Sequence, residues 1–419
     1  MKNVSVYRPS TYNIVVKLKD SASQFMLIHG YTGAIDIANE NVAALLRPGS
    51  RVSIDNGLVS ESTFNMLIQR GYLTQKTAQE ERDVCVRWAN FMHAWKKYFS
   101  LRAFMFVVSY DCNFRCPYCY ESMISNKGSQ WTQKTFTKEM VDRAYEAMLE
   151  IEPDRNKHQK KITLYGGEPL LAKNREIVEY IVKRGVELGY KFDAISNGYE
   201  IQYYKDLFGE GKIEAIQISV DGPREIHDKR RYHYKDGGTF DKIVENIGLA
   251  LDAGVTINLR ANTDATNWEY IESLHEQFKD AGYVGNPHFN FNAALVIGDE
   301  NIRPSHGPRS KQQFEPPHSL LTKADFNAKL LQTDVPGQHQ DQWIFKKLYT
   351  AIKYNTRVNF SPIYCAVQSS SYILDPLGDI YNCWETIGKK RHIIGHYLNG
   401  ITWEDEVDSS YKCNTYVFV

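Results

Sequence analysis

Three cysteines within eight residues form the clearest chemical signal in this sequence. Cys112, Cys116 and Cys119 follow a predicted strand, Phe104–Tyr110, with CX3CX2C spacing. Cysteine thiolates hold iron–sulfur clusters, commonly four of them, so three thiolates leave one iron open to bind another group. A zinc ion completed by a nearby histidine is the alternative that the spacing alone leaves open.

Polar and glycine-rich segments follow the next predicted strands, where a parallel α/β barrel carries its chemistry. Tyr165-Gly166-Gly167-Glu168-Pro169 ends the second strand. Its two glycines let a backbone approach a ligand, and Glu168 can accept a hydrogen bond from an ammonium group. Ser196-Asn197-Gly198 ends the third strand, Ser219 to Pro223 ends the fourth, and Arg260 ends the fifth. Together with the cysteines, these segments predict a ligand-lined barrel mouth.

These motifs resemble those of radical S-adenosylmethionine (SAM) enzymes. The cysteines match the CX3CX2C motif, and Gly166–Pro169 looks like the GGEP motif that receives the SAM amino group. Ser196-Asn197-Gly198 is similar to the ribose-side segment, and Tyr118 matches the aromatic position near the adenine. The segment from Ile218 to Pro223, with His227, Asp228 and Arg231, resembles a subgroup that carries an extra C-terminal cluster domain. The resemblance implies these SAM-binding residues: Tyr118, Gly166, Gly167, Glu168, Pro169, Ser196, Asn197, Ser219, Asp221, Arg231 and Arg260.

The resemblance also implies cofactors and a reaction. Cys112, Cys116 and Cys119 would hold a [4Fe-4S] cluster whose open iron binds the amino and carboxylate groups of SAM. One electron, from a donor such as flavodoxin or ferredoxin, would cleave SAM to methionine and a 5′-deoxyadenosyl radical that abstracts hydrogen from a C–H bond. The cofactors carry this chemistry, and the protein orients them and excludes water. The sequence identifies no general base.

The elements that must position these residues alternate between strand and helix patterns over residues 101–295. Alternation of this kind predicts βαβ units around a parallel sheet. The strand candidates are Phe104–Tyr110, Ile162–Tyr165, Phe192–Ser196, Ala215–Val220, Thr256–Arg260 and His288–Asn292. Six units predict an α/β fold, a partial (β/α)6 TIM-like barrel.

Residues 1–75 read as a separate winged-helix-like module of short strands and two helices, the second running from an N-cap at Ser60 to Gly71. It resembles the peptide-recognition modules of radical SAM maturases that act on ribosomally made peptides. There, a leader peptide adds a strand to a sheet edge; a module that only packs on the barrel is the alternative. Residues 76–100 predict a linker helix, Ala78–Phe99. Its aromatic stripe has the spacing of a buried face: Val84, Trp88, Phe91 and Trp95.

The C-terminal part divides into a loop and helical linker, 296–360, and a cysteine-bearing segment, 361–419. Cys365-x12-Gly378-x4-Cys383 resembles the opening of a SPASM or twitch auxiliary-cluster domain, with Cys413 as a third ligand. The chain departs from that family because the expected later cysteines are missing. The resemblance therefore implies an apparently truncated domain with one auxiliary cluster at most. Its candidate fourth ligands are His392, His396 and Asp379.

The composition argues against two classes of protein, nucleic-acid binders and membrane proteins. Fifty basic and fifty acidic residues give no net charge, which argues against a nucleic-acid binder. No apolar run approaches the ~20 residues needed to span a bilayer, and the N-terminus lacks the pattern of a secretory signal. We therefore expect a cytoplasmic protein with no nucleic-acid or membrane partner.

Three functions remain open at this point. The first is a maturase that cross-links or otherwise alters a precursor peptide with a leader sequence. The second is an enzyme that oxidises a sulfatase Cys or Ser to formylglycine, as anaerobic sulfatase maturases do. Such enzymes usually lack about 100 residues before the cluster motif, so the long N-terminus disfavours this one. The third is a catalytically inactive cluster protein that only binds a peptide.

Overall fold

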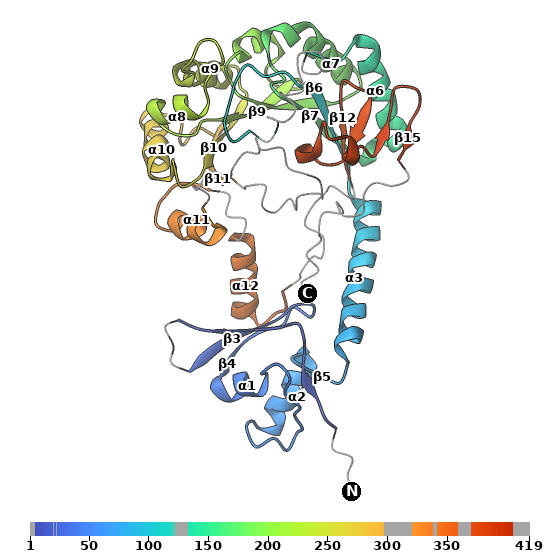
Figure 1. Cartoon of the computed structure of the whole chain (residues 1–419), viewed down its shortest axis with the longest axis vertical. Coiled ribbons are helices and arrows are strands. Elements are labelled where there is room, and N and C mark those ends of the chain that lie inside the picture. The colour runs from blue at the N-terminus through green and yellow to red at the C-terminus, as the bar shows by residue number, and fades with distance from the viewer. Residues whose placement is uncertain are drawn as a thin grey trace, which may run out of the picture. The chain divides into compact units, whose positions relative to one another are not determined.

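A sheet of parallel strands carries the predicted mouth residues. The computed structural model, drawn in Figure 1, describes residues 5–19, 21, 23–119, 121, 133–296, 321–337, 342–358 and 370–404. It has two compact units: Met1–Ser100 with His339–Ser369 and Ser410–Val419, and Leu101–Gln338 with Ser370–Ser409. We describe each unit by itself. The functions expected of the segments within them stay predictions.

Six parallel strands of the second unit lie side by side in chain order. They are β6 (Arg102–Ser109), β7 (His158–Gly166), β8 (Lys191–Ser196), β9 (Ile213–Ser219), β10 (Thr256–Thr263) and β11 (Phe289–Leu295). Each overlaps a strand predicted from the sequence, so the six predicted strands are confirmed. Among the described residues β11 and β6 do not pair with each other, and the sheet stays open.

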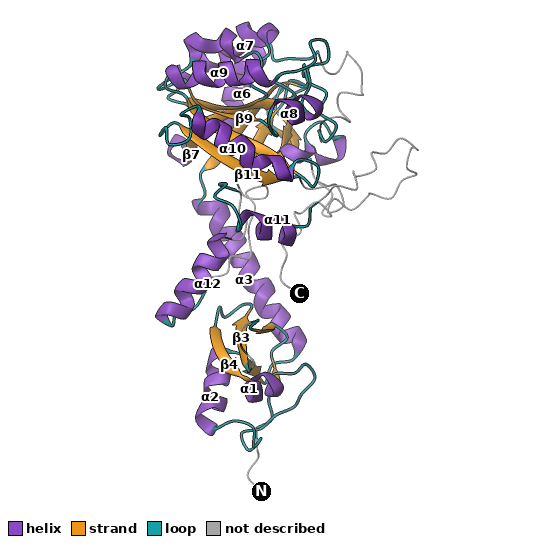
Figure 2. Ribbon diagram, turned by 90° about the vertical axis from the view of Figure 1, so that its left-hand side faces the viewer, coloured by secondary structure: helices purple, strands orange, loops and turns teal. Residues whose placement is uncertain are grey.

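Helices cover one face of this sheet, as the side view in Figure 2 shows. They are α6 (Lys138–Ile151), α7 (Arg175–Glu187), α8 (Arg224–Arg230), α9 (Phe240–Asp252) and α10 (Ile271–Asp280), and α11 (Lys323–Leu330) follows later in the chain. Short 3-10 helices lie at Arg155–Lys157, Ala172–Asn174, Ile201–Leu207, Trp268–Tyr270, Trp384–Thr386 and Lys390–His392.

Alternation along the strands sorts side chains between the two faces. On β10, Ile257, Leu259 and Ala261 are fully buried in the core that the helices share. The residues between them are only half-buried and lie on the opposite face, because successive side chains of a strand point to opposite sides. Arg260 therefore lies on the face away from the helices.

A C-terminal hairpin extends the same sheet, which the sequence did not predict. β12 (Ser371–Leu374) pairs in parallel with β6, and β13 (Asp379–Tyr381), β14 (Gly395–His396) and β15 (Thr402–Trp403) follow in antiparallel order. The turn between β12 and β13 has Gly378 at φ +93°. Asp375 accepts bonds from the backbone of Leu377 and Asp379, and from the Tyr110 hydroxyl at 2.6 Å.

The first unit contains a three-stranded antiparallel sheet. β2 (Asn13–Lys17), β3 (Gln24–His29) and β4 (Ile35–Asn39) pair in that order, and β1 (Arg8–Pro9) pairs with β5 (Leu73–Thr74). α1 (Glu40–Leu45) and α2 (Glu61–Arg70) share one core with Leu27, and α12 (Gln342–Tyr354) packs Ala351 against Ile28 of β3 in another. α2 has the predicted Ser60 and Gly71 caps. The description of the module as winged-helix-like stays a prediction.

The helix α3 (Ala78–Phe99) has the predicted bounds and begins at a capping box of Thr77 and Glu80. The prediction that its aromatic stripe is buried is wrong: Trp88, Phe91 and Trp95 are 41, 58 and 47% exposed. Helical spacing shows which side chains share one face of a helix, but it does not show whether another element covers that face. Among its described residues, α3 is buried only near its start, at Glu81 and Cys85. No described helix, α3 included, is both long and apolar enough to cross a membrane.

Candidate active site

The three clustered cysteines lie on the loop that follows β6. The Cys119 amide donates to the Cys116 carbonyl at 3.1 Å, and the Phe114 amide points at the Cys112 sulfur at 3.4 Å. Burial, with the nearby Glu121 and Cys116, raises the pKa of the Cys119 thiol to about 12. Burial also raises the pKa of Cys112, with further contributions from Glu168 and from both other cysteines. Cys116 and Cys119 therefore lie close enough to the Cys112 thiol to raise its pKa.

Within the described ranges, no three Cys, His, Asp or Glu side chains, the three loop cysteines included, lie in an arrangement that would hold a metal ion. The donor set at the loop is therefore identified by residue type and spacing, as three thiols in a CX3CX2C motif. This is the chemistry of an iron–sulfur cluster with one open iron.

Gly166 and Gly167 bring the end of β7 against the start of the cysteine loop. Gly166 has φ +132°, and a Cβ there would lie 2.2 Å from the Ser109 oxygen. A Cβ on Gly167 would lie 2.4 Å from the Asp111 oxygen. Two backbone bonds hold this approach, from Gly167 to Ser109 at 3.0 Å and from Glu168 to Asp111 at 2.7 Å. The glycines therefore position the loop through close backbone contact.

Glu168 connects the ends of β7 and β8. Its buried carboxylate accepts from the Ser196 hydroxyl at 2.8 Å and from the backbone amides of Asn197 at 2.5 Å and Leu170 at 2.9 Å. Burial raises its pKa to about 7, although these hydrogen bonds oppose the shift. Asn197 in turn donates to Asn113 of the cysteine loop at 2.7 Å. The Pro169 carbonyl accepts from Asn174 at 3.3 Å.

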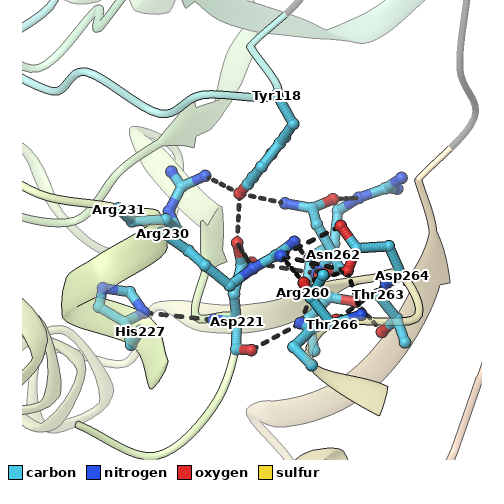
Figure 3. A network of polar contacts seen from close by, with 12 residues as sticks. Tyr118, Asp221, His227, Arg230, Arg231, Arg260, Asn262, Thr263, Asp264 and Thr266 are labelled. Atoms are coloured by element: carbon cyan, nitrogen blue, oxygen red, sulfur yellow. Dashed lines mark hydrogen bonds and ion pairs between the residues drawn. The ribbon is translucent and has the colours of Figure 1, made fainter. Parts of the chain in front are cut away.

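Tyr118 joins the loop to the ends of β9 and β10 in the network drawn in Figure 3. Its hydroxyl donates to Asp221 and accepts from Arg231 at 2.7 Å. Asp221 is fully buried and also accepts from the Asn262 amide at 3.1 Å. Three predicted residues from three segments therefore meet at one hydroxyl group.

Arginines balance the buried carboxylate of Asp221. Arg230 lies 3.5 Å from Asp221 and 3.0 Å from Asp264, and its guanidinium stacks over the Tyr118 ring at 5.0 Å. Arg260 donates to Asn262 at 2.8 Å, and burial lowers its pKa. Ser219 is also buried at this end of β9.

The predicted auxiliary-cluster ligands are described only in part. Cys383 follows β13 and is half-buried, whereas Cys365 and Cys413 lie outside the described residues. Two candidate fourth ligands pair with each other, because His396 lies 2.7 Å from Asp379 and 3.1 Å from Glu404. The third, His392, is buried and accepts from the neighbouring Arg391 at 3.0 Å.

Sequence reasoning missed four residues of this site: Asn113, Glu121, Arg230 and Asn262. Glu121 is buried near the cysteines, and burial raises its pKa to about 8. Asn262 could have been found from the strand period, because it follows Arg260 by two positions and so lies on the same face. Asn113 could have been found only as a polar residue inside the cysteine motif.

Comparison with known proteins identifies a domain within the second unit. The family model of the radical SAM superfamily matches residues 106–278. These residues form a radical SAM domain. Domains of this superfamily bind a [4Fe-4S] cluster and SAM, and the three thiols at the end of β6 fit the cluster by their number and spacing.

Similar proteins match this chain over different shares of its length. GTP 3′,8-cyclase of Rhizobium etli is 31% identical over 156 residues, 36% of this chain and 40% of that protein. A cysteine-type anaerobic sulfatase-maturating enzyme of Clostridium novyi is 28% identical over 184 residues, 41% and 46% of the two. The chain thus matches less than half of either relative's length. The structure of Streptococcus suis SuiB bound to precursor peptide SuiA covers 98% of this chain and 89% of that one, at 13% identity and a TM-score of 0.49.

Proposed function

We propose that this protein is a radical SAM peptide maturase that alters a ribosomally made precursor peptide by a cross-link or a similar side-chain change. The observation that carries the proposal is a radical SAM domain on the same chain as a separate module whose sheet has an exposed edge. When bound, the cluster and SAM supply a 5′-deoxyadenosyl radical that abstracts hydrogen from the peptide. The electron comes from a donor such as flavodoxin or ferredoxin, in the cytoplasm.

The residues of the mouth have distinct tasks in this proposal. Cys112, Cys116 and Cys119 hold the cluster. Gly166 to Pro169 and the end of β8 form the amino and ribose side of the SAM site, with Ser219 and Arg260 nearby. The network of Tyr118, Asp221 and Arg231 fixes the loop that carries the cluster, because it joins that loop to two strand ends.

The edge strand β2 is the proposed binding place of the leader peptide. At the two ends of β2, the Gly30 amide donates to the Tyr12 carbonyl and the Leu18 amide donates to the Gln24 carbonyl. The even-numbered residues of β2 therefore direct their N–H and C=O groups towards β3. In an antiparallel pair the residues between them point their N–H and C=O groups outward. Among the described residues, the outward backbone groups of Val15 and Lys17 therefore have no partner strand on this edge. The neighbouring side chains of Ile14, Val15 and Val16 are 38–42% exposed. An added strand would bond to these backbone groups.

The first experiment is anaerobic co-expression with candidate precursor peptides, namely any short open reading frames found beside the gene, followed by mass spectrometry of those peptides. A mass change that depends on Cys112 supports the proposal. An unmodified peptide, with SAM still cleaved by the protein and a reductant, overturns it. If no SAM is cleaved at all, the protein is the inactive peptide-binding alternative.

Val15→Pro tests the recognition role of β2. The substitution removes one outward N–H while the bonds between β2 and β3 remain, and proline is tolerated on such an edge. We expect the KM for the precursor to rise, whereas Val15→Ala, which keeps the N–H, should change it little. Equal KM values for both variants would mean that β2 does not bind the leader.

A sulfatase-maturase function is the second candidate, since the curated relatives include a sulfatase-maturating enzyme of Clostridium novyi. Incubation with a synthetic sulfatase peptide separates the two. Formylglycine on a Cys or Ser of that peptide would favour this candidate over the first.

The C-terminal segment is proposed to hold an auxiliary cluster through Cys365, Cys383 and Cys413. Protein reconstituted without oxygen would then contain about eight irons, from two four-iron clusters. We expect Cys383→Ala to lower this to about four. A value of about four in the unaltered protein would show that the segment holds no cluster.

A further inference from the structure

Carboxamide side chains line one face of the last three parallel strands. Gln217 of β9, Asn258 of β10 and Asn290 of β11 lie opposite one another in register, so they form a row across the sheet. The adjacent row towards the strand ends contains Arg260 and Asn292. All five lie on the face away from the helices, because the residues between them are buried in the helix-side core. We call Gln217, Asn258, Asn290 and Asn292 the carboxamide face.

Most polar side-chain atoms of the carboxamide face have no hydrogen-bond partner among the described residues. Asn290 donates to Asn258 at 3.0 Å. Among the described residues, the side chains of Gln217 and Asn292 have no hydrogen-bond partner, although both are half-buried. Each carboxamide offers two donors and one acceptor oxygen. Covering such groups with apolar atoms is costly, so whatever lies on this face must return hydrogen bonds.

The charges on the carboxamide face determine which kind of ligand it can bind. The row of Gln217, Asn258 and Asn290 carries no charge. Arg260 of the adjacent row is a charged side chain on this face, but it lies towards the strand ends, and Lys161 and Asp193 of β7 and β8 are paired with each other at 3.2 Å. An ionic ligand would lose its hydration without finding a counter-charge on the row. A neutral ligand that alternates donors and acceptors fits, and the main-chain amides of a peptide have that character.

We propose that the carboxamide face binds main-chain amide groups of the peptide segment that is modified; this rests on the proposed peptide maturase function. Neighbouring strands lie about 4.8 Å apart, so the row spans about 10 Å, the length of roughly three extended residues. The row lies two residues deeper than Arg260, about 7 Å from it along β10. The bound segment therefore extends from the row towards the strand ends, where the cluster loop lies.

The test compares near-isosteric variants of the full-length protein. Asn258→Leu, Asn292→Leu and Gln217→Met each remove hydrogen-bonding atoms at nearly constant volume. The controls, Asn156→Leu and Gln277→Met, alter exposed carboxamides elsewhere on the same unit. With a precursor peptide that the unaltered protein modifies, we expect KM to rise about fivefold for each face variant, the effect of one hydrogen bond. The controls should stay within about twofold.

A second arm alters the peptide instead. N-methylation of main-chain amides around the modified residue removes their donors, and should raise KM for the unaltered protein more than for Asn258→Leu. Unchanged KM in all three face variants overturns the inference. So does a lower melting temperature with unchanged KM, because the face would then be covered by the chain itself. Neither result contradicts the proposed maturase function. That proposal is contradicted only if the unaltered protein leaves the peptide unmodified.

Discussion

Replacing Gly167 by alanine should damage the site through the backbone of the cysteine loop. The added Cβ would lie 2.4 Å from the Asp111 oxygen and 2.7 Å from the Tyr110 oxygen, whereas side-chain Cβ atoms essentially never come within 3.0 Å of another heavy atom. The loop must therefore move by about 0.6 Å, the difference between 3.0 and 2.4 Å. Because Asp111 immediately precedes Cys112, that movement reaches the first thiol.

The expected cost follows from this displacement. Overpacking of a tight contact lowers the free energy of unfolding by about 1–3 kcal/mol. A misplacement of about 1 Å near reacting groups can lower a rate about 100-fold, so we expect about tenfold here. The assay is anaerobic 5′-deoxyadenosine release with a chemical reductant, together with iron content and a urea unfolding curve.

Gly248→Ala on α9 is the matched control, because its Cβ would meet only the end of the Tyr283 side chain, at 3.0 Å. It should retain activity. If Gly167→Ala retains full activity, iron and stability, then close approach at Gly167 does not position the cysteine loop.

Three further predictions follow from the structure. Changing Cys112, Cys116 and Cys119 together to alanine should abolish 5′-deoxyadenosine release while circular dichroism shows a folded protein; retained release would contradict the cluster assignment. Asp221→Asn removes one of the two buried carboxylates beside Arg230, and with it the charged acceptor of the Tyr118 hydroxyl, and should lower the free energy of unfolding by about 3 kcal/mol. Asp241→Asn, in an exposed pair with Arg224, should lower the free energy of unfolding by less than about 1 kcal/mol. Equal losses for the two variants would contradict the claim that burial makes the Asp221 contacts the stronger ones. Burial lowers the pKa of His29 to about 4, below its usual value of about 6.5, so the neutral form favours folding. Stability of the first unit should fall as the pH drops from about 6.5 towards 4. Hydrogen exchange of peptides covering β3 checks this, and His29→Gln should remove the dependence.

The succession of strands along the chain and the positions of the mouth motifs could be predicted from the sequence, because both depend on local patterns. Ile257 and Leu259 alternate with polar residues, and that period identifies β10 and its two faces without any tertiary information. The glycine pair before Glu168 likewise marks a strand end. These signals depend on a few neighbouring residues, so reading them needs no knowledge of the rest of the fold.

Long-range pairing could not be read in the same way. Nothing near Glu168 in the chain says that its carboxylate bonds to Ser196 and Asn197, because those partners are set by the order of strands in the sheet. The aromatic stripe of α3 failed for a related reason. The helical period predicts that Trp88 and Phe91 share a face, while their exposure depends on which surface the rest of the fold brings to them.

The pairing of β12 with β6 has a consequence for synthesis on the ribosome. Phe104 and Tyr372 are partners across the sheet although they lie 268 positions apart in the chain. At about 5–20 residues per second, translation needs roughly 15–50 s between the two. During that interval the outer edge of β6 has no strand beside it, and an unpaired edge invites pairing with other chains. The strand that leads into the cysteine loop is therefore exposed to aggregation until the C-terminal strands emerge, and a nascent chain stalled before residue 371 would keep that edge open.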